Sequence, residues 1–254
     1  MKTLSFVNQK GGVGKSTVCF NVGAALSLCG FSVLLIDSDP QGDLSSMSGH
    51  ETTEEDFSLY DVLHGTEARK AVQNLREGFS IIPADERLSF AELDLAEKKR
   101  TLLRDALKAF RRDYDFILID CPPSLNVLTV NALAASDGVI IPVQTQFLPL
   151  KGVSRLNGTI EKTRAALNKN LEVCGVVLTF FDRRQNLDNE VKESLSRAFG
   201  GKVFNTVIPR SVKLAEAPSH GLSIFEYAPR TRAAESFKEL AAEVIERSNT
   251  EDRI

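Results

Sequence analysis

Short, uninterrupted runs of apolar residues alternate along this chain with longer segments in which apolar positions recur every three to four residues. The runs at 33–36 and 116–119 contain no polar position, which fits strands buried on both faces of a sheet. The strands predicted in this way are Leu4–Val7, Ser32–Asp37, Phe79–Ile82, Tyr114–Asp120, Gly138–Val143, Val173–Phe180 and Asn205–Ile208. The segments with helical periodicity are Ser16–Leu28, Thr66–Leu75, Leu88–Phe110, Ser124–Ala135, Lys151–Leu167, Leu187–Phe199 and Ala233–Arg247.

This alternation predicts an α/β fold, a doubly wound and mostly parallel sheet flanked by helices, because parallel strands need helical crossovers between them. Three residues are expected to mark helix ends. Gly30 is placed as a C-terminal cap glycine, and Ser124 and Asp188 as N-terminal caps. No repeat, low-complexity tract or linker interrupts the pattern, so residues 1–254 are expected to form one domain.

Composition excludes several classes of protein. The chain has 43% hydrophobic and 26% charged residues, which is ordinary for a globular protein. No apolar stretch approaches the ~20 residues that span a bilayer, and the first strand begins without a signal peptide, so we expect a cytoplasmic protein with no membrane association. The four cysteines have no C-x-x-C spacing and are expected to be reduced packing residues, not ligands of zinc or an iron–sulfur cluster. They are Cys19, Cys29, Cys121 and Cys174.

The most informative motif lies at residues 9–17, Gln-Lys-Gly-Gly-Val-Gly-Lys-Ser-Thr, between the first predicted strand and the first predicted helix. A phosphate-binding loop requires this strand–loop–helix context. Glycines allow successive N–H groups to turn toward an anion, and the helix N-terminus behind them adds a partial positive charge. Lys15 is placed to reach the β- and γ-phosphates of a nucleotide, and the Ser16 hydroxyl to bind Mg²⁺. The G-x-x-x-x-G-K-[ST] pattern is incomplete, because Gln9 occupies its first glycine position.

A second lysine, Lys10, precedes the glycine pair of this loop. Its position at the entry of the turn directs its side chain away from its own nucleotide. One interpretation is that it crosses a dimer interface to the partner's phosphates. The other is an exposed lysine with no such role, and the spacing alone does not separate the two.

Acidic residues follow two of the predicted strands, at the edge where active sites of such sheets gather. Asp120 ends the apolar run 116–119 and is expected to support Mg²⁺ directly or through water. Asp37 and Asp39 follow the second strand, and their alternative role is to cap the next helix or turn. Cys121 stands where many fast ATPases carry a catalytic glutamate. Asp39 is therefore the candidate for orienting water, and turnover is expected to be slow.

Four segments together resemble one family. Residues 10–17 look like the deviant Walker A motif of the ParA/MinD ATPases. Residues 37–42 (Asp-Ser-Asp-Pro-Gln-Gly), 116–124 (Phe-Ile-Leu-Ile-Asp-Cys-Pro-Pro-Ser) and 208–221 (Ile-Pro-Arg-Ser-Val-Lys-Leu-Ala-Glu-Ala-Pro-Ser-His-Gly) are similar to signatures of the small, Soj-like ParA chromosome-partition proteins. The blocks occur in family order over nearly the whole chain. They imply the fold of the deviant Walker A class of P-loop NTPases. Residues 47–56 match no family signature, and the acidic run at 51–56 is expected to be a solvated loop.

The resemblance implies a partition ATPase that closes into a homodimer around ATP and Mg²⁺. In that scheme Lys10 reaches the partner's nucleotide, Lys15 holds the phosphates of its own, and Asp39 positions the attacking water. Ser16 and Asp120 support the metal. The other ATP-binding residues implied are Gly11, Gly12, Val13, Gly14, Ser16 and Thr17, with Pro209 and Ser211 beside the adenine. Position 211 is usually Asn in the Soj-like signature, so the base contact is expected to be weaker here. A ParB-type centromere-binding protein is the implied partner that stimulates hydrolysis.

The resemblance also implies sequence-independent binding to double-stranded DNA and association with the nucleoid. A net charge of −3 argues against a nucleic-acid protein, but the charge is unevenly distributed. Residues 197–232 carry six basic residues against two acidic ones, a local charge of +4, which permits a basic stripe on one face. Arg184 and Lys213 occupy positions that Soj-like proteins use for DNA contact. The supporting candidates are Arg210, Arg230 and Arg232, and the alternative for each of the five is an ordinary surface ion pair.

Other proteins share the loop. A MinD-like membrane ATPase would end in a basic amphipathic helix, whereas the last predicted helix here carries glutamates opposite its apolar stripe and is expected to pack on the core. A nitrogenase-type iron protein would need paired cysteines to bridge a cluster. A dethiobiotin or cobyrinate ligase would need a pocket for an acid substrate, and that alternative stays open. Within the family, positioning of a protein cargo instead of DNA also stays open.

Overall fold

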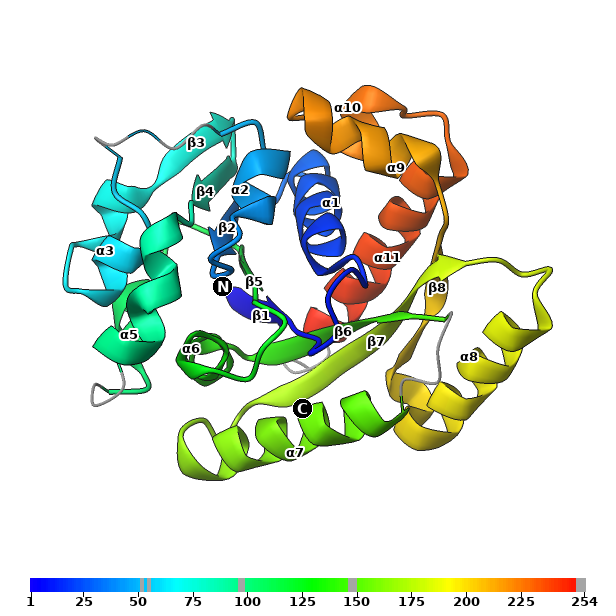
Figure 1. The fold of residues 1–254 in the computed structure, drawn as a ribbon. Coiled ribbons are helices and arrows are strands. Elements are labelled where there is room, and N and C mark those ends of the chain that lie inside the picture. The colour runs from blue at the N-terminus through cyan, green and yellow to red at the C-terminus, as the bar shows by residue number, and fades with distance from the viewer. Residues whose placement is uncertain (51–52, 54–55, 96–98, 146–149, 250–254) are drawn as a thin grey trace.

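The computed structural model describes residues 1–50, 53, 56–95, 99–145 and 150–249. Eight strands form one twisted sheet through the middle of the molecule (Figure 1), in the order β3-β4-β2-β5-β1-β6-β7-β8. Every neighbouring pair is parallel except β3 with β4. The strands are β1 Lys2–Phe6, β2 Val33–Asp37, β3 Gln73–Arg76, β4 Phe79–Ile82, β5 Phe116–Asp120, β6 Gly138–Gln144, β7 Glu172–Phe181 and β8 Val203–Pro209. The predicted α/β fold with a doubly wound, mostly parallel sheet is confirmed.

Helices cover both faces of the sheet (Figure 1). The helices are α1 Lys15–Leu28, α2 Asp43–Met47, α3 Leu59–Leu63, α4 Ala91–Asp94, α5 Leu102–Leu107, α6 Val127–Ala135, α7 Leu150–Ala166, α8 Asn186–Phe199, α9 Val212–Glu216, α10 Ile224–Tyr227 and α11 Arg232–Asn249. Buried side chains of α1, α2, α10 and α11 form one core cluster with the strands, and those of α3 to α8 form a second. The central strands are covered on both sides, which explains why β2 and β5 contain a run of apolar residues without alternation.

The last helix packs on the core, as its apolar stripe predicted. Phe237 and Leu240 of α11 are completely buried. On another side of this helix, Glu243 accepts hydrogen bonds from the backbone N–H groups of Asn205 (2.9 Å) and Thr206 (2.8 Å) in β8. These two donors belong to an edge strand, where N–H groups would otherwise stay open to a second chain. No helix among the described residues is both long enough and apolar enough to cross a membrane.

The helix predicted over 66–75 is wrong. Only a 3₁₀ turn forms there, Ala68–Ala71, and the chain then enters β3. β3 pairs antiparallel with β4 at the edge of the sheet. Because β4 lies outside residues 66–75, the spacing of apolar residues within that segment gives no indication of the pairing.

The single helix predicted over 88–110 is also wrong. The segment is divided among a 3₁₀ turn, the short helices α4 and α5, and a second 3₁₀ turn at Lys108–Phe110, with residues 96–98 outside the described residues. Its recurring apolar positions are nevertheless core positions, since Leu88 and Leu103 are both 1% exposed. They reach the same core from separate short elements.

The C-terminal cap at Gly30 is confirmed. Gly30 adopts a φ of 87°, in the left-handed region that favours glycine. Its N–H donates to the carbonyl of Ser27 (2.9 Å), and the N–H of Phe31 donates to the carbonyl of Leu26 (3.2 Å). These two bonds close a Schellman motif and end α1.

The two predicted N-terminal caps are wrong. Asn126, not Ser124, caps α6, with its side chain accepting from the N–H groups two and three residues on (3.0 and 3.3 Å). Asp188 lies inside α8, three residues after the N-cap residue Gln185. Its carboxylate accepts from the N–H of Asp182 (2.7 Å), so it ties down the loop between β7 and α8.

All four cysteines are free thiols. Cys19 and Cys121 are buried and Cys174 is partly buried, so a packing role holds for these three. Cys29 is exposed at the end of α1, and the predicted packing role is wrong for it. The acidic run at 51–56 lies mostly outside the described residues.

Candidate active site

The loop between β1 and α1 has the backbone shape that its glycines suggested. Gly12 and Gly14 have φ values of 72° and 84°, which side chains with a Cβ rarely adopt. Gly14 is the N-cap residue of α1, so the helix begins at Lys15. Lys15 and Ser16 are only 7% and 8% exposed. The arrangement aims the first N–H groups of α1 at the mouth of the loop, where an anion is favoured.

Hydrogen bonds to the neighbouring strands β6 and β7 hold this loop in place. Asn8 donates from Nδ2 to the carbonyl of Pro142 in β6 (2.6 Å), and its Oδ1 accepts from the N–H of Lys10 (3.0 Å). Thr179 of β7 donates from Oγ1 to the carbonyl of Val13 (2.8 Å). The two clamps fix both ends of the glycine-rich turn. Neither Asn8 nor Thr179 belongs to the motif, so sequence analysis missed both.

Lys10 is exposed at the outer side of the loop. Lys15, by contrast, is buried at its inner side. The two lysines therefore occupy different sides of the same turn, which is the placement that a lysine directed at a second subunit requires. That Lys10 reaches the nucleotide of a partner subunit stays a prediction.

Two carboxylates meet beside Lys15. Asp37 and Asp120 are register partners at the carboxyl ends of β2 and β5, and both are completely buried. Asp37 is fully engaged: its oxygens accept from the N–H (2.8 Å) and hydroxyl (2.7 Å) of Ser45 and from the N–H of Asp39 (3.1 Å). Asp37 thus anchors the start of α2, the capping role that had been its alternative.

Asp120 has the opposite environment. Neither of its carboxylate oxygens accepts a hydrogen bond from any described residue, although both are buried. Burial, and then the negative charge of Asp37, raise the pKa of Asp120, while the Ser16 hydroxyl and the Lys15 ammonium act in the other direction. A buried carboxylate without partners is costly. Its two open oxygens are the chemistry expected of a group that faces a cation.

Asp39 lies on the loop that follows β2 and is 6% exposed. Its Oδ1 accepts from the N–H of Gln41 (3.1 Å). Burial raises the pKa of Asp39, and the positive charge of Lys15 lowers it. Burial likewise raises the pKa of Asp37, to about 6. Lys15 is therefore the positive charge that two acidic residues of the predicted site, Asp39 and Asp120, share.

The donor set fits Mg²⁺ only together with a nucleotide. Among the described residues, no three His, Cys, Asp or Glu side chains come together as a self-sufficient metal site. Mg²⁺ commonly takes one or two protein oxygens and completes its shell with water and phosphate. The Ser16 hydroxyl and the unpartnered oxygens of Asp120 are suited to that role.

A cavity of about 150 Å³ adjoins the loop on the side of β7 and β8. Pro209 and Ser211, the residues expected beside the adenine, line it. Phe180 also lines it and has a φ of 54°, the one left-handed non-glycine residue in the described part of the chain. Strained backbone of this kind often marks a functional site. The remaining lining residues are Gly14, Thr17, Val18, Thr179, Ile208, Leu214 and Ala215.

The five basic residues expected to contact DNA differ in how they are held. Arg184, with a side chain 90% exposed, pairs with Asp182 at 3.0 Å. Lys213 pairs with Glu216 at 2.8 Å. Arg232 pairs with two glutamates of α11, at 3.3 and 3.0 Å. Arg210 and Arg230 are exposed and pair with no carboxylate of a described residue. The ion-pair alternative is therefore realised for three of the five, most fully for Arg232.

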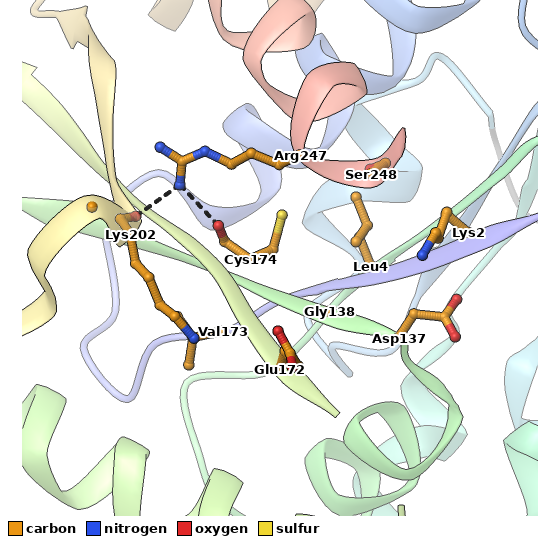
Figure 2. A pocket seen from close by; sticks show the side chains of 11 residues that line it. Lys2, Leu4, Asp137, Gly138, Glu172, Val173, Cys174, Lys202, Arg247 and Ser248 are labelled. Atoms are coloured by element: carbon orange, nitrogen blue, oxygen red, sulfur yellow. Dashed lines mark hydrogen bonds between the residues drawn. The ribbon is translucent and has the colours of Figure 1, made fainter. Parts of the chain in front are cut away.

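A second cavity, of about 240 Å³, lies at the opposite edge of the sheet, where β1, β6 and β7 begin (Figure 2). Arg247 of α11 extends across it. Its guanidinium donates to the carbonyls of Cys174 (2.9 Å), Lys202 (2.9 Å) and Val203 (3.0 Å) and lies 4.0 Å from the centroid of the Phe204 ring. These bonds tie the end of α11 to β7 and β8. The cavity thus has a structural explanation and lies away from the loop and its carboxylates.

Comparison with known proteins agrees with the geometry. A family model described as an AAA domain matches residues 1–173. The chromosome partitioning protein ParA of Caulobacter vibrioides is 46% identical over 253 residues, covering 97% of this chain and 95% of that protein. The sporulation initiation inhibitor protein Soj of Bacillus subtilis is 44% identical over 249 residues, covering 96% and 98%.

A solved structure has the same fold. The cobyrinic acid a,c-diamide synthase of Mycobacterium smegmatis with bound ADP and magnesium superposes with a TM-score of 0.87 at 31% identity, covering 99% of this chain and 96% of that one. The full-length similarity to ParA and Soj, together with the phosphate-binding loop and its carboxylates, decides the family. This chain belongs to the ParA and Soj family of chromosome-partitioning P-loop ATPases.

Proposed function

We propose that this chain is a DNA-partition ATPase whose ATP-bound dimer binds double-stranded DNA without sequence preference and leaves it after hydrolysis. The observation that carries the proposal is the meeting of Lys15, Asp39 and the unpartnered Asp120 at one edge of the sheet. A buried lysine and a carboxylate without hydrogen bonds from described residues, both beside a helix N-terminus, suit the phosphates of a nucleoside triphosphate and the metal ion bound to them.

ATP binding would use both parts of the described site. The N–H groups of residues 11–17 and the Lys15 ammonium would hold the phosphates, and the cavity lined by Phe180, Pro209 and Ser211 would take the base. When bound, Mg²⁺ would neutralise charge on the β- and γ-phosphates, held by Ser16 and supported by Asp120. Lys10, exposed on the outer side of the loop, would reach the nucleotide of the partner and so make closure of the dimer depend on ATP.

Hydrolysis would depend on Asp39. Asp39 is buried, and only its Oδ1 accepts a backbone hydrogen bond, from Gln41. Its Oδ2 accepts none from a described residue, whereas both oxygens of Asp37 are engaged by backbone N–H groups. The raised pKa of Asp39 suits a residue that orients water and accepts a proton. Cys121 follows Asp120 where a glutamate would activate water in faster ATPases, so the dimer persists until a partner accelerates turnover.

DNA binding would use the edge of the sheet where β7 and β8 end. Phe181 and Pro209 are register partners, so the chain segments carrying Arg184 and Arg210 leave adjacent strands at the same edge. Lys213 follows on α9. A dimer doubles these contacts. Affinity for DNA falls with a power of the salt concentration whose exponent grows with the number of phosphate contacts, so doubling the contacts changes the affinity far more than twofold and dimer formation alone can switch binding on. Arg232, engaged by two glutamates, would contribute least.

The partner that accelerates hydrolysis would be a ParB-type centromere-binding protein, and the ATP-bound protein would be associated with the nucleoid. The relatives named as ParA and Soj, at 46% and 44% identity, support this assignment. A family member that positions a protein cargo would share the same ATP and DNA sites, because the cargo is chosen by the partner.

One structurally similar protein is an enzyme of a different functional class. The solved cobyrinic acid a,c-diamide synthase shares the fold at 31% identity, and a ligase of that kind would need a site for an acid substrate. The higher identity to partition proteins over the full chain favours the partition ATPase.

The test is binding of a random-sequence DNA duplex in the presence of ADP and then of ATP, at two salt concentrations. We expect tight, salt-sensitive binding with ATP only. Absence of binding in both nucleotide states would overturn the proposal, and acid substrates for a ligase would then be tested.

A further inference from the structure

Lys213 is held by its own molecule. Its Nζ lies 2.8 Å from Oε2 of Glu216, one helical turn later in α9. It also lies over the ring of Tyr227, 5.5 Å from the centroid. The Tyr227 hydroxyl donates to the same Oε2 of Glu216 (3.0 Å). A carboxylate and an aromatic face thus engage the lysine at the same time.

One further contact keeps this clamp in shape. The His220 ring stacks on the ring of Tyr227, with centroids 5.1 Å apart and an interplanar angle of 19°. The clamp therefore joins α9, the 3₁₀ turn after it and α10. The side chains of Lys213 and Glu216 are 51% and 40% exposed, so a phosphate from solvent has access to the lysine. The hydrogen bond from Lys213 lowers the pKa of Glu216, which keeps the carboxylate charged at neutral pH.

Arg184 has a carboxylate of its own as well. Its Nε and Nη2 donate to the two oxygens of Asp182 (3.1 and 3.0 Å). Each of the two cations that lead the proposed DNA surface is thus paired, whereas Arg210 and Arg230 pair with no carboxylate of a described residue. The Lys213 clamp is the more elaborate of the two because a second element, α10, contributes to it.

We propose that Glu216 competes with DNA phosphate for Lys213. Glu216 holds the lysine until a phosphate displaces it, and so limits the affinity of each protomer for DNA. This inference rests on the proposed function. A phosphate that replaces Glu216 leaves a free carboxylate, which takes up a cation, so the exchange releases few counterions in total. Exposed ion pairs are weak, so the exchange needs no change in the fold. Each protomer loses the Lys213–Glu216 ion pair when it binds DNA, and the doubled phosphate contacts of a dimer offset this loss.

The test compares Glu216→Gln with the unchanged chain. Binding of a random-sequence duplex is measured with ATP over a series of salt concentrations, at equal concentrations of ATP-bound dimer. We expect Glu216→Gln to bind at least about threefold more tightly, with an upper limit of about thirtyfold set by two exposed ion pairs of about 1 kcal/mol each. The slope of log affinity against log salt should steepen by up to about 0.9 for each of the two lysines.

Three variants separate the clamp from a simple change in net charge. Glu193→Gln removes the same charge from an exposed glutamate of α8 that lies 4.0 Å from Arg197, and it should change neither the slope nor the affinity by more than about twofold. In a Lys213→Gln background, Glu216→Gln should give no gain, because its effect passes through Lys213. Tyr227→Phe, which removes only the hydroxyl bond to Glu216, should give a smaller gain with the fold intact.

The outcomes distinguish this inference from the proposed function. If the unchanged chain binds no DNA with ATP, the proposed function fails. If the unchanged chain binds, but Glu216→Gln matches it or keeps its gain in the Lys213→Gln background, the clamp alone is wrong. A steeper salt dependence that disappears with Lys213→Gln would establish it.

Discussion

Asp37 and Asp120 lie side by side as register partners at the ends of β2 and β5, both completely buried, yet only the Asp37 carboxylate accepts hydrogen bonds from described residues. The neighbouring strands therefore carry two like charges into the protein interior and compensate just one of them by hydrogen bonds. A site of this kind stores free energy that a bound cation would release.

The first prediction follows from that imbalance. Replacing Asp120 by Asn should raise the stability of the nucleotide-free protein at pH 7.5 by roughly 1–3 kcal/mol, because it removes one of two adjacent buried acidic groups, the one whose oxygens accept no hydrogen bond from a described residue. The same change should abolish ATP hydrolysis if Asp120 supports the metal. Thermal unfolding without nucleotide measures the first effect, and a melting temperature below that of the unchanged chain would contradict it.

The same pair predicts a pH dependence. Burial raises the pKa of Asp37 to about 6 and also raises the pKa of Asp120, so the folded state binds protons more tightly than the unfolded chain. Stability therefore falls as pH rises through the raised pKa values. The unchanged chain should lose stability between pH 5 and pH 7.5, and Asp120→Asn should lose less. Equal pH slopes for the two proteins would show that the pair does not titrate as described.

Ser211 lines the cavity expected to hold the base, at a position where the Soj-like signature usually has Asn. Ser211→Asn should tighten ATP binding about threefold to tenfold, because an amide offers one further hydrogen bond worth roughly 1 kcal/mol. Binding of a fluorescent ATP analogue measures this. Val212→Asn, at the neighbouring residue with a 70% exposed side chain, is the control that should change nothing. An unchanged affinity for Ser211→Asn would place the base elsewhere.

The proposed DNA surface predicts a graded response to charge reversal. Arg184→Glu combined with Lys213→Glu should abolish DNA binding while ATP-dependent dimer formation persists. Arg232→Glu should have a smaller effect, because Arg232 is already engaged by two glutamates. Arg197→Glu, at an exposed arginine of α8 with a partner only at 4.0 Å, is the charge-matched control for each single reversal. An equal loss of DNA affinity for Arg197→Glu and for Arg184→Glu or Lys213→Glu alone would mean that net charge alone governs binding.

Gly175 and Gly158 offer a matched pair for the fold. A Cβ at Gly175 would clash with the ring of Phe204 and lie 2.7 Å from Nη1 of Arg247, whereas a Cβ at Gly158, in α7, would meet nothing within 4 Å. Gly175→Ala should cost about 1–3 kcal/mol through overpacking. Gly158→Ala should instead stabilise by about 0.5–1 kcal/mol, because alanine is the better helix former. Denaturant unfolding measures both, and a neutral Gly175→Ala would contradict the packing described around Arg247.

The parts of the site that are local in sequence could be predicted from it. The loop around Lys15 is a contiguous motif, and Asp120 is marked by the apolar run that it ends. The supports of the loop could not be predicted, because Thr179 bonds to Val13 across 166 positions and no motif marks it. Phe180 gives no signal either, since its left-handed backbone comes from the end of a strand packed against the loop.

The same distinction holds for the fold. β2 and β5 could be recognised as buried strands from their own composition. β3 could not, because it forms an edge through pairing with β4, and its residues are mostly polar. The pairing of Arg232 with Glu239, two turns of α11 apart, was visible in the spacing and would have lowered the rank of this arginine as a DNA contact.

If ATP closes a dimer through Lys10, the mass of the Asp39→Ala variant in solution should show it. Hydrolysis should stop in this variant, so light scattering with ATP should give twice the 27.9 kDa of one chain, and with ADP the mass of one chain. Adding Lys10→Ala should return the ATP-bound protein to the mass of one chain, since the contact across the interface is lost. A dimer of equal stability in the double variant, or a single chain for Asp39→Ala with ATP, would contradict the account.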